Sequence, residues 1–259
     1  MTILHTSRAG QFRLVLAALI SLAGCAATAP GLRVVESRAI AADPDLANFS
    51  VTVHVLLQVH EHPDEQRRAI QDARQVAACQ ERVVATALRL AAQGARASVV
   101  EGRYAAGTPD QPEPLRTAQA PATIIPSAKW ILAGRAELAV YGFEARPFNE
   151  FGVTVVRELG ASAARARELA KDGYEALSEV DQAEYGRLVQ DEVTRLNLWH
   201  AGVMPARSFL ALQTALAVAL ARRDSQVQLL IGKQHWIDLL YAVDRHDDVR
   251  LRLVPYPCE

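Results

Sequence analysis

The stretch VTVHVLLQVHEHPDEQ, residues 51–66, decides the fold that we expect for this chain. Its first half alternates valines with other residues and then becomes continuously apolar, which is typical of a buried strand. The strand runs out at His60, and Pro63 follows where a helix would begin, with acidic residues in the first turn. The stretch therefore predicts a strand that places an ionisable residue at the rim of a sheet, followed by a helix that ends near Gln93.

The same alternation of strand and helix recurs along the rest of the chain. Short apolar strands are predicted at 97–100, 139–143, 227–231 and 249–254, and helices at 127–137, 205–223 and from Trp236. Strands separated by helices indicate an α/β fold with a mostly parallel sheet covered by helices on both faces. We expect one α/β domain at 46–259, with a charged insertion of two or three helices at about 150–200.

The N-terminus has the pattern of an export signal. Arg8 and Arg13 precede an apolar run at 14–20 that is too short to span a bilayer comfortably, and the tetrad LAGC follows at 22–25. This arrangement resembles a bacterial lipobox. The resemblance implies that residues 1–24 are a signal peptide, whereas the alternative is an uncleaved helix with an ordinary cysteine.

Lipidation at Cys25 would attach the protein to a membrane. The lipobox implies cleavage before Cys25 and acylation of that residue, and several acyl chains anchor a protein stably. Ala26 stands where an aspartate typically retains such proteins in the inner membrane, which favours the outer membrane and a periplasm-facing protein. Residues 25–45 are rich in alanine and proline, and we interpret them as the acylated cysteine and a tether.

Charge and cysteine content narrow the choice of partners and crosslinks. The formal charge of -1 gives no electrostatic reason to expect a nucleic acid as a partner. Cys79 and Cys258 remain in a compartment that permits disulfides. They could join the C-terminus to the helix that holds Cys79, or they could be two unpaired thiols, and the sequence leaves both possibilities open.

Four of the predicted strands run out into an ionisable residue, namely His60, Glu101, Glu144 and His235. If the strands are parallel, these residues meet at the edge where open α/β sheets bind ligands. Two imidazoles and two carboxylates could hold a metal ion or serve as general acid and base. The alternative is that each is an ordinary polar residue of a loop. The chain contains no G-x-S-x-G elbow, P-loop, G-x-G-x-x-G turn or H-E-x-x-H helix.

The order of these motifs resembles the ChaN/TraB/Tiki superfamily, which includes erythromycin-esterase-like proteins. The resemblance covers about residues 51–254 and consists of strand-His-x-x-Pro, strand-Glu-Gly, Gly-x-Glu, an arginine-containing helix and Gly-x-x-His. It implies that the site residues are those at the matching positions. These are His60, Glu101, Glu144, Arg207, Gly232 and His235.

The chain departs from the family pattern ahead of His60, where Leu57-Gln58 replaces the usual Gly-Glu. The change removes a candidate base or ligand, and it removes a glycine that would allow close backbone approach. The departure argues for binding at least as strongly as for catalysis.

Members similar to ChaN are bacterial lipoproteins implicated in haem binding, and that precedent implies tyrosine ligation. The tyrosines near the predicted site strands are Tyr104, Tyr141 and Tyr241. The alternative for each is a half-buried ring that packs against the core.

Three functions are compatible with these observations. The first is an outer-membrane lipoprotein that binds a small-molecule ligand at the strand edge, either haem or a divalent metal held by His60, His235 and Glu101. The second is a metal-dependent or His/Glu-dependent hydrolase of the cell envelope. The third is a degenerate domain that binds an envelope protein through the charged insertion.

Overall fold

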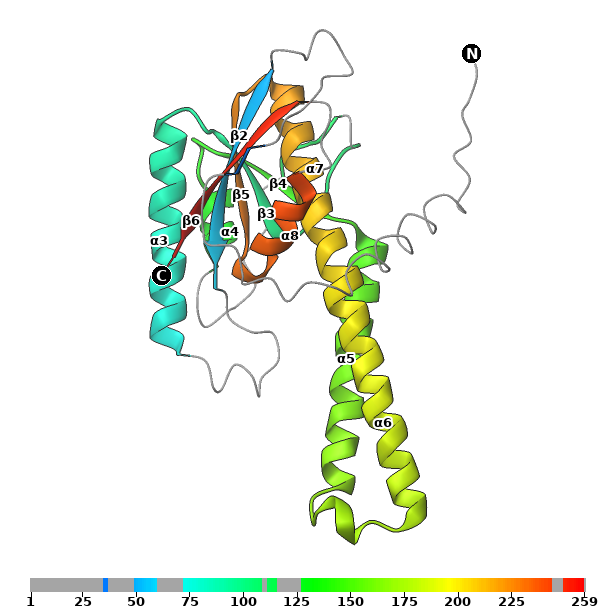
Figure 1. Ribbon diagram of the computed structural model, residues 1–259. Coiled ribbons are helices and arrows are strands. Elements are labelled where there is room, and N and C mark those ends of the chain that lie inside the picture. The colour runs from blue at the N-terminus through cyan, green and yellow to red at the C-terminus, as the bar shows by residue number, and fades with distance from the viewer. Residues whose placement is uncertain are drawn as a thin grey trace, which may run out of the picture. The chain divides into compact units, whose positions relative to one another are not determined.

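The computed structural model describes most of the chain after residue 48 (Figure 1). The described residues are 49–59, 72–108, 111–115, 127–243 and 249–258, together with a two-residue strand at 35–36. The lipobox with Cys25 and the predicted site residue His60 both lie outside the described residues.

The centre of the protein is a six-stranded sheet with the order β1-β6-β2-β5-β3-β4. Five neighbouring strands are parallel, and the short edge strand β1 pairs antiparallel with β6. This arrangement confirms the predicted α/β fold. The strands are β1 (Val35–Glu36), β2 (Ser50–Gln58), β3 (Ala97–Tyr104), β4 (Ala139–Glu144), β5 (Gln226–Gly232) and β6 (Arg250–Pro257).

The helices follow the strands as the sequence predicts, with shifted ends. Helix α3 begins after Asp72, whose side chain accepts hydrogen bonds from the backbone N–H groups of Arg74 and Gln75. The start that we predicted for this helix, at Pro63, lies outside the described residues. Helix α4 ends at Ala133, earlier than expected. The helices are α3 (Ala73–Ala92), α4 (Ala128–Ala133), α5 (Arg146–Leu169), α6 (Glu179–Asn197), α7 (Met204–Arg222) and α8 (Trp236–Val243), with short turns at Tyr174–Ala176, Leu198–Val203 and Lys233–His235.

Two hydrophobic cores cover the two faces of the sheet. Val53 and Leu229 pack with α7 and α8, whereas Leu56 and Leu230 pack with α3 and α4 on the opposite face (Figure 1). Neighbouring residues of a strand point to opposite faces, so the continuous apolar runs of β2 and β5 supply both cores. Gln228 of β5 is a buried polar residue, and its Nε2 donates to the carbonyl oxygens of Ala87 at 2.9 Å and Ala95 at 2.7 Å.

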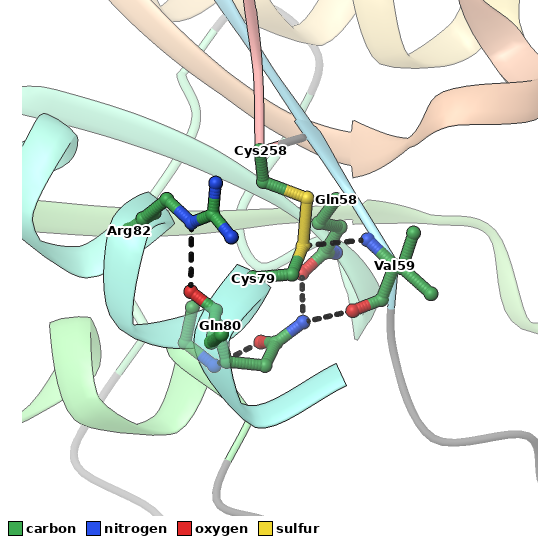
Figure 2. The surroundings of a disulfide bond; sticks show 8 residues. Gln58, Val59, Cys79, Gln80, Arg82 and Cys258 are labelled. Carbon is green, nitrogen blue, oxygen red and sulfur yellow. Dashed lines mark hydrogen bonds between the residues drawn. A yellow bond between two sulfur atoms is a disulfide. The ribbon is translucent and has the colours of Figure 1, made fainter. Parts of the chain in front are cut away.

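A disulfide joins Cys79 of α3 to Cys258 at the end of β6, with the two Cα atoms 4.9 Å apart (Figure 2). The backbone N–H of Val59 donates to the Cys79 sulfur at 3.1 Å, so the bridge lies beside the end of β2. The structure thus decides between the two possibilities that the sequence left open. A bridge across 179 residues restricts the unfolded chain strongly.

Gln80 connects the end of β2 with two helices (Figure 2). Its buried amide donates to the carbonyl oxygen of Val59 and, at 3.4 Å, to Oε1 of Gln58. Its Oε1 accepts a hydrogen bond of 2.6 Å from the N–H of Ala128, one of the unpaired N–H groups at the start of α4. Gln58, which replaces a glutamate of the family pattern, is therefore a buried, uncharged acceptor in this chain.

The described chain divides into two compact units, one of which is the helical segment 147–206. In this segment α5 and α6 form an antiparallel hairpin, with ion pairs between Arg165 and Glu184 at 3.1 Å and between Arg195 and Glu158 at 3.2 Å. The hairpin corresponds to the predicted insertion at about 150–200. The other unit contains the sheet, α3, α4, α8 and most of α7.

One helical run among the described residues, Glu179–Arg222, contains a window apolar enough to cross a membrane. Half of that window is buried inside the protein, and α7 supplies core residues such as Leu212 and Leu216. The apolar character is therefore explained by packing against the sheet.

Candidate functional site

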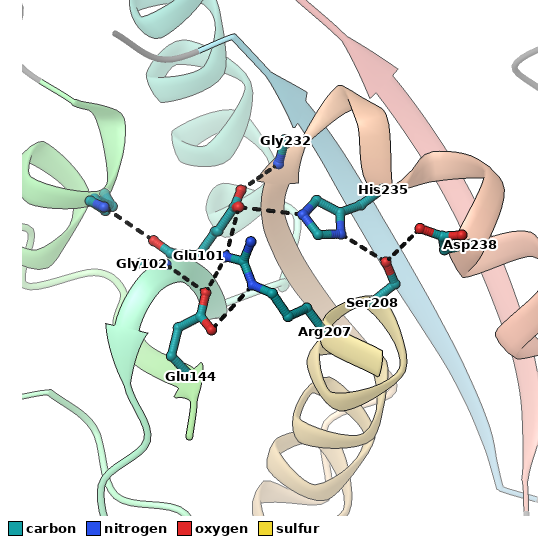
Figure 3. A network of polar contacts seen from close by, with 9 residues as sticks. Glu101, Gly102, Glu144, Arg207, Ser208, Gly232, His235 and Asp238 are labelled. Carbon is teal, nitrogen blue, oxygen red and sulfur yellow. Dashed lines mark hydrogen bonds and ion pairs between the residues drawn. The ribbon is translucent and has the colours of Figure 1, made fainter. Parts of the chain in front are cut away.

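The dipeptide Glu101-Gly102 at the end of β3 is the centre of a buried polar network (Figure 3). The pairing of β3 with β4 shifts register between Val100 and Tyr104, so regular strand geometry ends at this dipeptide. The Glu101 carboxylate accepts a hydrogen bond of 2.7 Å from the N–H of Gly232 at the end of β5. At the carboxyl edge of the sheet, β5 thus supplies the donor and the neighbouring strand β3 supplies the acceptor of this hydrogen bond.

Arg207, at the start of α7, bridges the two carboxylates. Its Nη2 donates to Glu101 at 3.0 Å and also to Glu144, while its Nε donates to the second oxygen of Glu144 at 3.4 Å. The three side chains keep only 12%, 8% and 1% of their surface exposed for Arg207, Glu101 and Glu144. Burial disfavours the guanidinium charge, but the hydrogen bonds and the attraction of both carboxylates outweigh it and raise the pKa of Arg207.

His235 continues the network on the other side of Glu101. Its ring is completely buried, with Nδ1 2.7 Å from the hydroxyl of Ser208 and Nε2 3.4 Å from Glu101. The second contact is at ion-pair distance but is not aligned as a hydrogen bond. The Ser208 hydroxyl also lies 3.4 Å from a carboxylate oxygen of Asp238 on α8. Successive polar contacts therefore connect Asp238 with Glu144. The residues between them are Ser208, His235, Glu101 and Arg207.

Lys129 of α4 closes over the backbone of the central dipeptide. Its Nζ donates to the carbonyl oxygen of Glu101 at 3.3 Å. Gly102 has a φ of +75°, and a Cβ there would lie 2.4 Å from Nζ. The left-handed backbone favours a glycine at this position, and a side chain there would also displace the ammonium group of Lys129.

The structure brings together four of the residues that the sequence singled out, namely Glu101, Glu144, Arg207 and His235. They come from two strands, the start of a helix and the turn after a third strand, and they meet because these strands are parallel. His60 is outside the described residues, although β2 ends in register with Gly232, since Gln58 pairs with that residue.

The predicted tyrosines do not belong to the network. Tyr141 lies in the middle of β4, and its ring is buried in the core with residues of α7. Its hydroxyl lies 3.5 Å from the guanidinium of Arg222, at the C-terminal end of α7. Tyr104 lies under the guanidinium of Arg146, 4.9 Å from the ring centre, and Tyr241 is 52% exposed on α8. A ligand-binding role of these three tyrosines stays a prediction.

Metal binding at the network would have to compete with bonds already made. Among the described residues, no group of three or more histidine, cysteine or acidic side chains is placed to hold a metal ion. The carboxylates of Glu101 and Glu144 instead face the Arg207 guanidinium and backbone N–H groups. The set of His60, His235 and Glu101 stays a prediction, because His60 is not described.

Three residues of the network were not singled out from the sequence. Ser208 adjoins Arg207, and Asp238 lies three positions after His235, a spacing that puts two side chains on one side of a helical turn. That spacing was the available signal for Asp238. Lys129 had no such signal, since it reaches the site only through the packing of α4 beside β3.

A second buried histidine, His54, lies within β2 and has its own partners. Its Nδ1 is 3.1 Å from the Tyr256 hydroxyl, and its Nε2 is 3.0 Å from the amide oxygen of Gln226. Burial lowers the pKa of His54, and the hydrogen bond with Gln226 offsets part of that effect. These partners belong to β5 and β6, and none of them is a member of the Arg207 network.

No family model, no curated protein and no solved structure matches this chain. The resemblance to the ChaN/TraB/Tiki superfamily rests on the motifs of the sequence alone and stays a prediction.

Proposed function

We propose that this protein is a lipoprotein of the outer membrane that faces the periplasm, is anchored through an acylated Cys25, and binds a small molecule at the carboxyl edge of its sheet. The observation that carries the proposal is the Arg207 network, in which one guanidinium and two carboxylates are held at that edge with little exposure.

Stability alone does not account for such a network. Replacing a buried ion pair by well-packed apolar side chains is often neutral or stabilising, so buried charges are weak evidence of a stabilising role. The network lies where open parallel sheets bind ligands. Its members come from separate elements, and each is fixed by hydrogen bonds before any ligand arrives. Preorganised polar groups of this kind orient a ligand at low entropic cost.

Burial favours binding over catalysis. A general base has to come within hydrogen-bond reach of the substrate. His235 and Ser208 have no exposed surface, and both ring nitrogens of His235 already face protein groups. The Arg207 side chain, by contrast, keeps 12% of its surface exposed. The guanidinium of Arg207 is thus accessible to a ligand, whereas the imidazole of His235 and the hydroxyl of Ser208 are buried.

A hydrolase is the second candidate, and one observation favours it. Ser208, His235 and Glu101 lie in the order of a nucleophile, a base and an orienting acid, with 2.7 Å between the Ser208 hydroxyl and the imidazole. Cleavage of a p-nitrophenyl ester that is lost in both Ser208→Ala and His235→Ala would favour this candidate over binding.

The binding proposal is tested with the protein lacking its lipid, made with Cys25→Ser. Haem is titrated while the Soret band is recorded, metal content is measured, and unfolding is followed with a library of small metabolites. We expect at least one of these ligands to raise the unfolding temperature. The effect should be lost in Glu144→Gln and kept in Glu184→Gln, which alters an ion pair of the helical hairpin. Absence of any ligand effect on the folded protein contradicts the proposal.

The anchoring proposal is tested separately by labelling growing cells with radioactive palmitate. We expect the protein to incorporate label and to fractionate with outer membranes. Cys25→Ser should abolish labelling, whereas Cys79→Ser should keep it. An unlabelled wild-type protein would show that the lipobox pattern is misleading.

A further inference from the structure

The outward face of Arg207 carries donors that the protein does not use. All polar contacts of Arg207 with the described residues go through Nε and Nη2. Nη1 is not among the buried atoms that lack a partner, and the side chain keeps 12% of its surface exposed, so solvent reaches Nη1. Figure 3 draws no contact to this nitrogen. The nitrogen therefore presents two N–H groups beside the network, fixed in place by the bonds at the other two nitrogens. Arginine N–H groups suit the oxygens of carboxylates and phosphates.

A second cation approaches the same dipeptide from α4. Lys129 binds the carbonyl oxygen of Glu101, whose carboxylate binds Arg207, so the two cations meet at one residue. The ammonium group has three N–H donors, and its hydrogen bond within the described residues uses one of them on an uncharged carbonyl. Lys129 and Arg207 are thus both held by protein contacts while retaining free donors.

The charges around Lys129 do not balance. The groups that act on it are the carboxylates of Glu101 and Glu144 and the guanidinium groups of Arg103 and Arg207, so with Lys129 itself there are three cations and two anions. Burial lowers the pKa of Lys129, and the attraction of the two carboxylates offsets only part of this effect. A buried cation in excess is stabilised by an additional anion.

Arg103 extends this cationic side of the site. Its guanidinium lies 4.2 Å from the ring centre of Trp130, the neighbour of Lys129 in α4. Stacking on an aromatic ring leaves the edge of a guanidinium available for hydrogen bonds.

We infer that the ligand of this site carries an anionic group, a carboxylate or a phosphate, which is bound jointly by Arg207 and Lys129. The inference rests on the proposed binding function and narrows it to a chemical class. Glu101 and Glu144 serve in this arrangement as positioning residues, since they fix the guanidinium and leave one of its nitrogens for the ligand.

The test compares three benzene derivatives of similar shape and different charge, together with inorganic phosphate, on the intact lipoprotein in a nonionic detergent. Benzoate, neutral benzamide, cationic benzamidine and inorganic phosphate are titrated by calorimetry at constant ionic strength. We expect benzoate or phosphate to bind and both benzamide and benzamidine to bind at least tenfold more weakly. Binding of benzoate alone indicates a carboxylate ligand, and binding of phosphate alone indicates a phosphate ligand.

Two variants assign the binding to the proposed residues. Lys129→Met should weaken anion binding at least fivefold, and Arg207→Lys, which keeps the charge but removes Nη1, should weaken it further. Lys171→Met is the matched control, because this exposed lysine pairs with Glu168 in the hairpin and should leave binding unchanged. Far-UV circular dichroism verifies that each variant is folded, and Lys129→Met alone suffices if Arg207→Lys does not fold.

The outcomes separate the inference from the function on which it rests. If benzamide or benzamidine binds as tightly as the anion that binds best, the site does not select for negative charge. That result overturns the inference and leaves the binding function standing. Anion binding that Lys129→Met does not affect places the anion elsewhere and also overturns it. If neither anion binds, the inference is wrong, and the haem and metabolite measurements decide separately whether the site binds any ligand.

Discussion

Removing Arg207 should destabilise the α/β unit more than any loss of an exposed ion pair. The change Arg207→Met keeps much of the side-chain volume but leaves Glu101 and Glu144 buried without the guanidinium that bonds to both. At an effective dielectric constant of about 20, unit charges about 4 Å apart attract by about 4 kcal/mol, and Arg207 has two such partners. Relaxation and entry of water recover part of this loss, so we expect the unfolding free energy to fall by about 3–5 kcal/mol.

Urea unfolding at pH 7 with the disulfide intact measures this change, and Arg222→Met is the matched control within the same unit. Arg222 pairs with Asp224 at 2.7 Å, but both side chains are about one-third exposed. Exposed pairs contribute about 0–1 kcal/mol, so the control should stay within that range. A protein of this size loses roughly 2–4 °C of melting temperature per kcal/mol, and a thermal scan should show the same order of effects.

A double-mutant cycle with Glu144→Gln isolates the interaction itself. Once Arg207 is absent, neutralising Glu144 removes a buried charge that has lost its guanidinium partner, so its effect should be much less unfavourable than in the wild type. We expect a coupling energy of at least about 2 kcal/mol. Equal costs for Arg207→Met and Arg222→Met, or a coupling near zero, would refute the description of Arg207 as a buried bridge.

Four further predictions concern other parts of the α/β unit and the hairpin. Cys258→Ser opens the bridge over 179 residues and should lower the unfolding free energy by about 2–4 kcal/mol, and adding a reductant should then have no further effect on urea unfolding. The pKa of His54 is lowered in the folded protein, so between that pKa and about 6.5 the unfolded chain binds more protons than the folded one. The unfolding free energy should therefore rise with pH through this window. His54→Gln should remove this part of the pH dependence. Gly102→Ala should cost at least about 1–2 kcal/mol, because the left-handed backbone is strained for alanine and the new methyl group meets Lys129. Gly160→Ala, where a Cβ meets no atom within 4 Å inside a helix, should instead stabilise the hairpin by about 0.5–1 kcal/mol as judged by its melting temperature.

Much of the fold could be predicted from the sequence because its signals are local. The continuous apolar run of β2 and the valines and leucines of β5 identify buried strands wherever they occur, and the helices between them leave parallel pairing as the economical arrangement. Helix ends were less predictable. Helix α4 ends at Ala133, with Gly134 as its C-cap, rather than near Glu137, since the exact end of a helix depends on what the neighbouring segments pack against.

The candidate site could be predicted only in part. Glu101, Glu144 and His235 follow directly from strands that end at one edge, and Arg207 came from the motif resemblance. The identity of their partners could not be predicted, because Lys129 reaches Glu101 through the packing of a separate helix, and Ser208 reaches His235 across two elements. Tyr141 shows the converse, since its closeness to a site residue in sequence did not decide which face of the sheet its ring occupies.

The sequence by itself determined the α/β class of this protein, the strand ends at which ionisable residues gather, and the expectation of a lipidated N-terminus. Only the tertiary structure decided that Cys79 and Cys258 are joined, and that Arg207 binds both carboxylates while one of its nitrogens faces outward. The physical reason is that apolar periodicity acts within one element, whereas a disulfide or a shared guanidinium requires side chains separated by tens to hundreds of residues to come within a few ångströms.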